Sequence, residues 1–203
     1  MAHILHLDAS PRGERSISRQ LSREFIEGWK RLHPTDSIAY RDVGRDPVPH
    51  VTEAWVVGAF TPLETHPADA QAAMRLSDVL IDEFLAADRY VFGVPMYNFG
   101  VPSTFKAYVD QIVRVGRTFT TDGKGLALGK KMLVVSARGG NYAPRGPMQA
   151  FDHQEPWLRR IFGFVGITNI RFVHAQGLNM GDESREAGLK SARERIEELV
   201  KSW

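Results

Sequence analysis

Short apolar runs alternate with amphipathic stretches along the whole chain. The first run is Ile4 to Leu7, and apolar side chains then recur every three or four residues from Ile17 to Leu32, as on one face of a helix. This alternation continues to the end of the chain and predicts strands at 4–7, 37–43, 90–94, 131–136 and 169–174, the second of them near a sheet edge. Helices are expected at 17–32, 51–60 and 67–86, from 102 onward, at 154–164, and over a last segment that contains Leu189, Ala192, Ile196, Leu199 and Val200.

Strands that are separated by helices need crossover connections, and these connections make a parallel sheet covered on both faces. The chain has 203 residues, 43% of them hydrophobic, and neither an internal repeat nor a linker, so we expect a single domain over residues 1–203. With five strands, an α/β fold with the flavodoxin-like, doubly wound order 2-1-3-4-5 is the leading topology. In this order the ligand crevice lies at the carboxyl ends of strands one and three.

Composition argues against several classes of function. Lys and Arg total 26 against 24 Asp and Glu, and no basic run could follow a nucleic acid backbone, so we expect no nucleic acid partner. Because the chain has no cysteine, redox chemistry would need a cofactor, and the seven histidines have no metal-ligand spacing. No apolar run approaches the roughly 20 residues of a membrane span, and the N-terminal segment has no signal-peptide pattern. We therefore expect a cytoplasmic protein without a metal or a membrane contact.

The loop after the first predicted strand has the composition of a phosphate site. Ser10 stands at the strand end, and Ser16, Ile17 and Ser18 open the next helix, where free backbone N–H groups and the helix dipole favour an anion. Ser16 fits equally well as an ordinary helix N-cap, so both interpretations stay open. The loop has only one glycine, Gly13, which excludes the glycine patterns of P-loops and dinucleotide-binding folds.

The loop after the third predicted strand suits a planar ring system. It consists of Met96, Tyr97, Asn98 and Phe99. Three apolar side chains at the mouth of a sheet favour a flat ligand, and the amide of Asn98 offers both a donor and an acceptor. The structural alternative is that the aromatic side chains fold back into the core.

A third loop follows the fourth predicted strand and consists of Ser136, Ala137, Arg138, Gly139 and Gly140. Two adjacent glycines let a backbone approach a ring closely and present bare N–H groups, although an ordinary Gly-Gly turn has the same composition. Three loops at the carboxyl ends of strands, each suited to a different part of one molecule, indicate a phosphorylated planar cofactor. FMN fits best.

These segments resemble a known family. Residues 4–18, 95–103 and 138–140 are similar to those of the bacterial FMN-dependent NADH azoreductases, also described as FMN-dependent NADH:quinone oxidoreductases, and the similarity covers essentially the whole chain. The resemblance implies a homodimer whose FMN sites are completed near the subunit interface. It further implies that Ser10 and residues 16–18 hold the phosphate, that residues 96–99 line the ring, and that residues 136–140 meet its pyrimidine side. Members usually carry a hydroxyl residue where Ala137 stands, so a side-chain hydrogen bond from this position is lost here.

The same resemblance implies the activity. NADH, with NADPH as an alternative donor, would pass a hydride to N5 of FMN in a ping-pong cycle, and a quinone or an aromatic azo compound would then accept the electrons; no side chain acts as a catalyst. The alternatives are a flavodoxin-like electron carrier, against which the net charge of +2 argues, and a flavin-binding protein without turnover. Candidate aromatic walls of the substrate site are Phe60, Phe119, Tyr142, Phe162 and Phe172.

Overall fold

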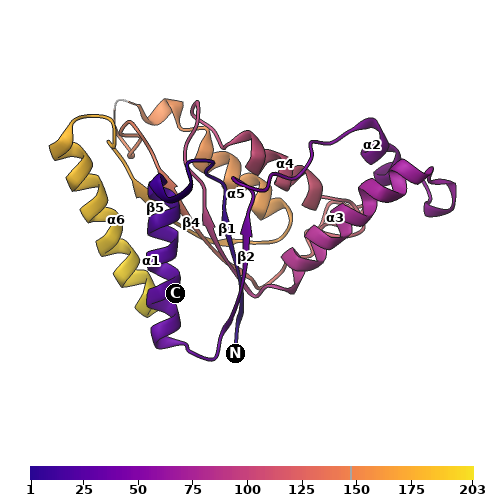
Figure 1. The fold of residues 1–203 in the computed structure, drawn as a ribbon, viewed down its shortest axis with the longest axis horizontal. Coiled ribbons are helices and arrows are strands. Elements are labelled where there is room, and N and C mark those ends of the chain that lie inside the picture. Colours follow the sequence, from indigo (N-terminus) through magenta and orange to yellow (C-terminus); the bar gives the residue numbers. More distant parts are fainter. Residues whose placement is uncertain (147) are drawn as a thin grey trace.

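A five-stranded parallel sheet forms the centre of the molecule (Figure 1). The computed structural model describes residues 1–146 and 148–203. The strands are β1 (His3–Asp8), β2 (Ser37–Asp42), β3 (Arg89–Gly93), β4 (Lys131–Ala137) and β5 (Asn169–Ala175). Their order is β2-β1-β3-β4-β5 and every neighbouring pair is parallel, which confirms the predicted fold class and the edge position of the second strand.

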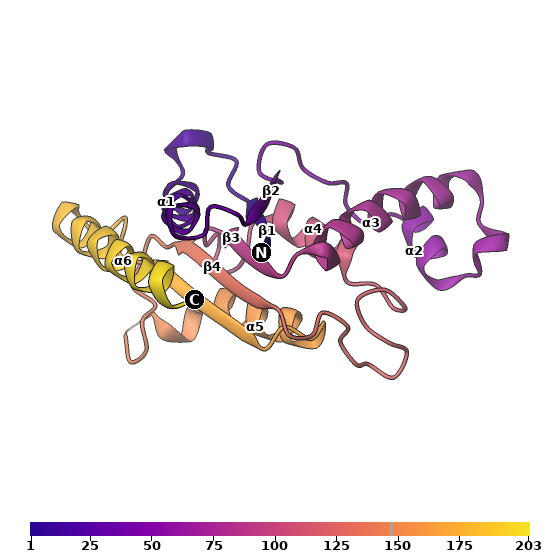
Figure 2. The same cartoon turned by 90° about the horizontal axis from the view of Figure 1, so that it is seen from below.

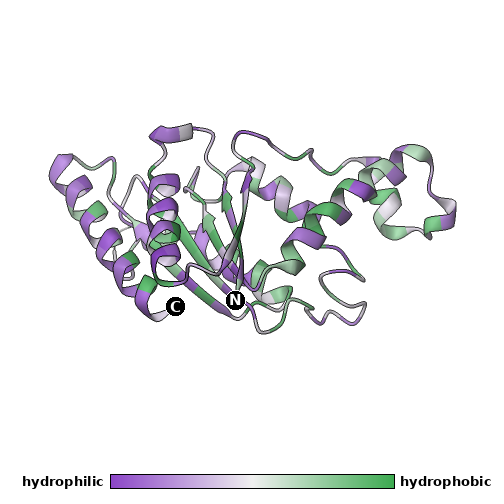
Figure 3. Ribbon diagram, turned by 60° about the horizontal axis from the view of Figure 1, so that its bottom comes forward, coloured by the Kyte–Doolittle hydropathy of each residue, from purple (hydrophilic) through white to green (hydrophobic). Residues whose placement is uncertain are grey.

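Helices cover both faces of this sheet, as the doubly wound fold requires (Figure 2). One face packs against α1 (Ile17–Leu32) and α6 (Asp182–Ser202). The other face packs against α3 (Ala68–Ala86), α4 (Ser103–Ile112) and α5 (Gln154–Phe164). Hydrophobic residues accordingly follow the strands and the inner faces of the helices, whereas α6 is largely hydrophilic on its outer face (Figure 3).

Helix α2 (Glu53–Phe60) and the N-terminal half of α3 extend away from the sheet as an arm (Figures 1 and 2). Val56, Phe60 and Leu63 are exposed on this arm, Phe60 to 73%. Burial of such side chains would be favourable, so the arm offers apolar surface for a contact outside this chain. Within residues 1–146 and 148–203, no helix combines the length and the apolar content that a membrane crossing requires.

The backbone pairing of the sheet continues past the strand ends. Ala9 N donates to Gly93 O at 2.9 Å, and Met96 N donates to Ala137 O at 3.0 Å. The loops that follow β1, β3 and β4 therefore leave the sheet side by side at one edge. This edge is the crevice that the strand order predicts.

Candidate functional site

The first of these loops carries three buried serines at and before the N-terminus of α1. Ser10, Ser16 and Ser18 are all buried, and the Oγ atoms of Ser16 and Ser18 lie 3.2 Å apart. Ser16 is the N-cap of α1, since its Oγ accepts from Arg19 N, although at 3.4 Å this bond is long. The amides of Ile17 and Ser18, in the first turn, have no acceptor within the helix. Capping thus leaves hydroxyl and N–H donors for an anion, and the two interpretations of Ser16 are compatible.

A buried arginine anchors this loop from below. Arg19, 1% exposed, donates to Ser10 O at 3.0 Å and forms a two-bonded ion pair with Asp42, at 2.5 and 2.8 Å. Gly44 packs so closely that a Cβ there would lie 2.4 Å from Ser10 O. Sequence analysis missed these residues, because an arginine on an amphipathic helix usually lies on the solvent face and nothing local places it under a loop.

Three more polar residues are buried beside Arg19. Ser22 Oγ donates to Asp8 Oδ1 at 2.9 Å and lies 3.0 Å from His6 Nε2. Burial raises the pKa of the Asp8 carboxyl to about 6 and lowers the pKa of His6 to about 4. Both groups are therefore held mainly in their neutral forms between pH 4 and 6. The charge of Arg19 favours the neutral form of His6 and opposes that of Asp8, where burial outweighs it.

The second loop makes a tight turn that displays its two central residues. Tyr97 and Gly100 exchange both backbone hydrogen bonds, at 3.1 and 3.0 Å, and Asn98 and Phe99 between them have φ values of 47° and 68°. Positive φ at both central positions is the pattern of a type I′ turn, in which Asn is favoured and Phe is strained. Phe99 is 41% exposed, so the expectation of an aromatic patch outside the core is confirmed for it. Strain at a displayed aromatic residue is typical of functional loops.

The third loop carries donors that the protein leaves unused. Ser136 is fully buried, and its Oγ has no hydrogen-bond partner among the described residues. The carbonyls of Gly139 and Gly140 accept from Asn179 N and Gly177 N, each at 2.9 Å, whereas their own N–H groups have no acceptor in the described part of the chain. A Cβ on Gly139 would lie 2.7 Å from Asn179 Nδ2. A side chain at position 139 would therefore have to displace the Asn179 amide, and the free N–H groups of both glycines are available to a ligand.

Arg138 belongs to this loop through its backbone, and its side chain is buried. Its Nη1 atom donates to Asp152 Oδ2 at 2.8 Å, and burial lowers the pKa of the guanidinium. The ring of Tyr142 lies 6.0 Å from the guanidinium carbon. Ala137 is the last residue of β4, one residue beyond the strand expected at 131–136, and its carbonyl is the acceptor for Met96 N.

An open cavity of about 600 Å³ adjoins the second loop. It is lined by Tyr97, Asn98, Gly100, Val101, Ser103, Lys106, His153 and Trp157. An apolar wall with a few polar groups and this volume suits a planar molecule. The cavity therefore leaves room for a second molecule beside the turn.

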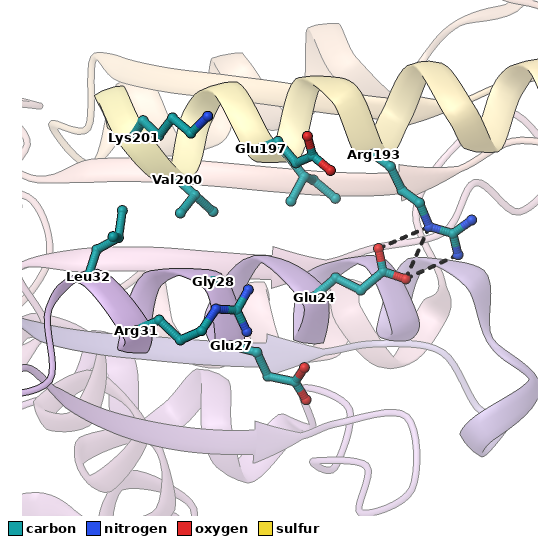
Figure 4. A pocket seen from close by; sticks show the side chains of 10 residues that line it. Glu24, Glu27, Gly28, Arg31, Leu32, Arg193, Glu197, Val200 and Lys201 are labelled. Atoms are coloured by element: carbon teal, nitrogen blue, oxygen red, sulfur yellow. Dashed lines mark hydrogen bonds and ion pairs between the residues drawn. The ribbon is translucent and has the colours of Figure 1, made fainter.

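A second cavity, of about 470 Å³, lies between α1 and α6 and has no part in this site (Figure 4). Its walls include Gly28 and Val200, and an ion pair between Glu24 and Arg193 lies at one side. Apart from Glu24, at the middle of the helix, the residues that α1 contributes come from its C-terminal half. Because α1 runs antiparallel to the strands, this half lies toward the edge opposite the three loops.

Of the five candidate aromatic walls, Tyr142 lies near the loops, with its ring centroid 6.4 Å from that of Phe99. The other four are placed elsewhere. Phe162 is fully buried in the core and Phe172 packs against the core. Phe60 is the last residue of α2 in the exposed arm, and Phe119 packs on Phe164 at the C-terminal end of α5. In the described part of the chain, no cluster of three or more His, Asp or Glu residues could hold a metal.

Comparisons with known proteins agree with this geometry. A family model described as a flavodoxin-like fold matches residues 2–200. FMN-dependent NADH:quinone oxidoreductase 2 of Trichormus variabilis and the FMN-dependent NADH:quinone oxidoreductase of a Nostoc species are both 56% identical to this chain over 207 residues, with full coverage of both chains. The crystal structure of an FMN-dependent NADH-azoreductase from Bacillus anthracis in complex with FMN superposes with a TM-score of 0.89 at 26% identity, covering 99% of this chain and 98% of the other. The chain belongs to the flavodoxin-like fold family and, within it, to the family of the FMN-dependent NADH:quinone oxidoreductases.

Proposed function

We propose that this protein is an FMN-dependent NADH:quinone oxidoreductase that also reduces aromatic azo compounds to amines. The observation that carries the proposal is that three loops follow adjacent strands at one edge of the sheet: the first carries hydroxyls at a helix N-terminus, the second an aromatic turn, and the third free N–H groups. The names of the relatives at 56% identity indicate NADH as the electron donor and a quinone as the electron acceptor, and the name of the FMN-bound azoreductase indicates azo compounds as further acceptors.

The donor set fits FMN. The hydroxyls of Ser10, Ser16 and Ser18 and the amides of Ile17 and Ser18 would hold the phosphate, because a dianion needs several convergent donors. Burial of these hydroxyls keeps competing water away. Arg19 lies beneath the loop and adds positive charge that Asp42 largely balances.

The ring would lie between the second and third loops. Met96, Tyr97 and Phe99 offer it flat apolar contacts, and the Asn98 amide supplies a donor and an acceptor at its edge. The N–H groups of Gly139 and Gly140 and the Ser136 hydroxyl, which have no partner within residues 1–146 and 148–203, would favour negative charge on the pyrimidine side. Bound FMN would supply the hydride and electron transfer between NADH and the quinone or azo compound, so the protein needs no nucleophilic side chain.

The cavity beside Tyr97 and Asn98 is the proposed place for the nicotinamide and the acceptor in turn. We further propose that the protein works as a cytoplasmic homodimer. The exposed apolar side chains of the arm, Val56, Phe60 and Leu63, support a contact with a second copy, because a monomer would leave this surface in water.

Anaerobic mixing of the FMN-loaded protein with NADH tests this function. We expect rapid bleaching of the flavin absorbance near 450 nm, followed by its return when a quinone is added. A flavin that NADH does not reduce would refute the proposal and would favour an electron carrier or a non-catalytic flavin-binding protein. NADPH in a parallel experiment compares the two donors, and sedimentation velocity measures the oligomeric state.

A further inference from the structure

Two consecutive residues at the start of α5 hold the second loop at two points. Gln154 Nε2 donates to the carbonyls of Val94 and Pro95, each at 3.0 Å, just where the chain leaves β3. His153 N donates to Phe99 O at 3.1 Å, at the tip of the turn, and shares this N–H with Phe151 O at 3.0 Å. The second loop is therefore held where it leaves β3 and again at its tip, and both bonds come from another part of the chain.

The same segment also holds the third loop. Asp152 Oδ2 accepts from Arg138 Nη1 at 2.8 Å, while Asp152 Oδ1 accepts from the backbone N–H groups of Gln154 and Glu155, at 3.0 and 3.1 Å. Glu155 Oε2 lies 2.6 Å from His174 Nε2 and so joins the segment to β5. Four consecutive residues, 152–155, thus contact both loops and the strand beside them.

The chemistry of Gln154 is unusual for its surroundings. The side chain is fully buried, and its Oε1 atom has no partner among the described residues. An apolar side chain of similar length would avoid that unpaired oxygen, so packing alone does not call for glutamine here. What glutamine adds is two donors on one nitrogen, directed at two successive carbonyls that would otherwise be buried without a bond.

We propose that residues 152–155 form a clamp that fixes the second and third loops, after β3 and β4, relative to each other. Gln154 is the positioning residue of this clamp. This inference rests on the proposed function, because it places the flavin ring against these loops. The clamp does not hold the first loop, which is anchored by Arg19 instead. The ring and the phosphate of FMN are therefore positioned by separate networks, and a clamp variant should disturb the ring alone.

Riboflavin lacks the phosphate, so comparing its binding with that of FMN distinguishes an effect on the ring from an effect on the phosphate. Dissociation constants of FMN and riboflavin are measured by fluorescence titration for the wild type and for Gln154→Leu. We expect the variant to weaken both flavins by the same factor, on the order of tenfold, because two buried carbonyls lose their donor and the loop relaxes. The ratio of the two constants stays that of the wild type, and the visible absorption band of the bound flavin shifts with the altered ring environment.

Leu158→Ala is the matched control. Leu158 is fully buried one turn further along α5, so its truncation destabilises the same helix without removing a bond to either loop. We expect this variant to lower the urea midpoint while leaving both flavin constants and the absorption band unchanged. If Gln154→Leu does not fold, Asp152→Asn tests the clamp, since it keeps the Oδ1 acceptor and turns an amide donor toward Arg138.

Different results would overturn the clamp alone or the proposed function together with the clamp. Unchanged flavin constants in Gln154→Leu, a loss confined to FMN, or an equal loss in Leu158→Ala would each overturn the clamp while leaving the proposed function intact. A folded wild-type protein that binds neither flavin would overturn the function and the clamp together.

Discussion

The buried pair of His6 and Asp8 makes a quantitative prediction about stability and pH. Burial raises the pKa of Asp8 from its ordinary 3.8 to about 6 and lowers that of His6 from 6.5 to about 4. Between pH 4 and 6 the folded protein holds a proton on Asp8 that the unfolded chain has lost, so Asp8 contributes stability at low pH that disappears as the pH rises. The contribution of His6 to stability rises with pH instead, because in this range His6 is protonated in the unfolded chain and neutral in the folded protein.

The two effects are nearly equal in size. Each corresponds to one proton, so each changes the free energy of unfolding by about 1.36 kcal/mol per pH unit, or about 2 kcal/mol between pH 4.5 and 6. In the wild type they cancel. Asp8→Asn removes the Asp8 effect and leaves the His6 effect, so the free energy of unfolding of this variant, relative to the wild type, should rise by about 2 kcal/mol from pH 4.5 to pH 6. His6→Gln leaves only the Asp8 effect, so its free energy of unfolding should fall by a similar amount over the same range.

The other ionisable groups of the cluster keep one charge state in this window. The hydrogen bonds with Asp42 raise the pKa of Arg19, and burial raises that of Tyr40. Burial acts to raise the pKa of Asp42 too, but the hydrogen bonds from Arg19 outweigh it and hold the pKa below its ordinary range. The pH dependence of the free energy of unfolding of each variant, relative to the wild type, therefore reports on the substituted group alone.

Urea unfolding followed by tryptophan fluorescence at pH 4.5, 5.0, 5.5 and 6.0 measures these slopes. The double variant, Asp8→Asn with His6→Gln, serves as the control and should run parallel to the wild type. If both single variants also run parallel to the wild type, neither group titrates abnormally in the folded protein, and the account of the buried cluster is wrong.

Three further predictions concern the loops. Replacing Ser16 and Ser18 together with Ala should weaken FMN by about tenfold to a hundredfold and leave riboflavin unchanged in the same titration; an equal loss of both would contradict the phosphate role. Asn98→Ala and Asn98→Gly should both weaken FMN, but only Ala should also lower the free energy of unfolding, by about 1 kcal/mol, because the residue has positive φ. Gly93→Ala would place a Cβ 2.2 Å from Asp8 Oδ1 and should cost about 1–3 kcal/mol in urea unfolding, which a stable variant would refute.

Sequence analysis placed the strands and the three loops correctly because both depend on local patterns. A parallel sheet brings the carboxyl ends of its strands to one edge whatever the side chains are, so the positions of Ser10, Asn98 and Gly139 at that edge follow from the strand order alone. Helix boundaries were less certain, as at α2, which begins at Glu53 rather than near 51 because Thr52 caps it. That these loop residues bind FMN remains a prediction.

What the sequence does not reveal is what supports the loops. Arg19, Gln154 and Asp152 are polar residues on or beside amphipathic helices, and their spacing is that of ordinary solvent-facing positions. Each becomes an anchor only because the helix it belongs to packs with its N-terminus at the carboxyl edge of the sheet, where loop carbonyls lack partners. This geometry arises from the crossover connections, which return every helix antiparallel to the strands. In this fold, therefore, the first turns of α1 and α5 are where positioning residues should be sought, and a glutamine or arginine buried there deserves the same test as a residue in the loops themselves.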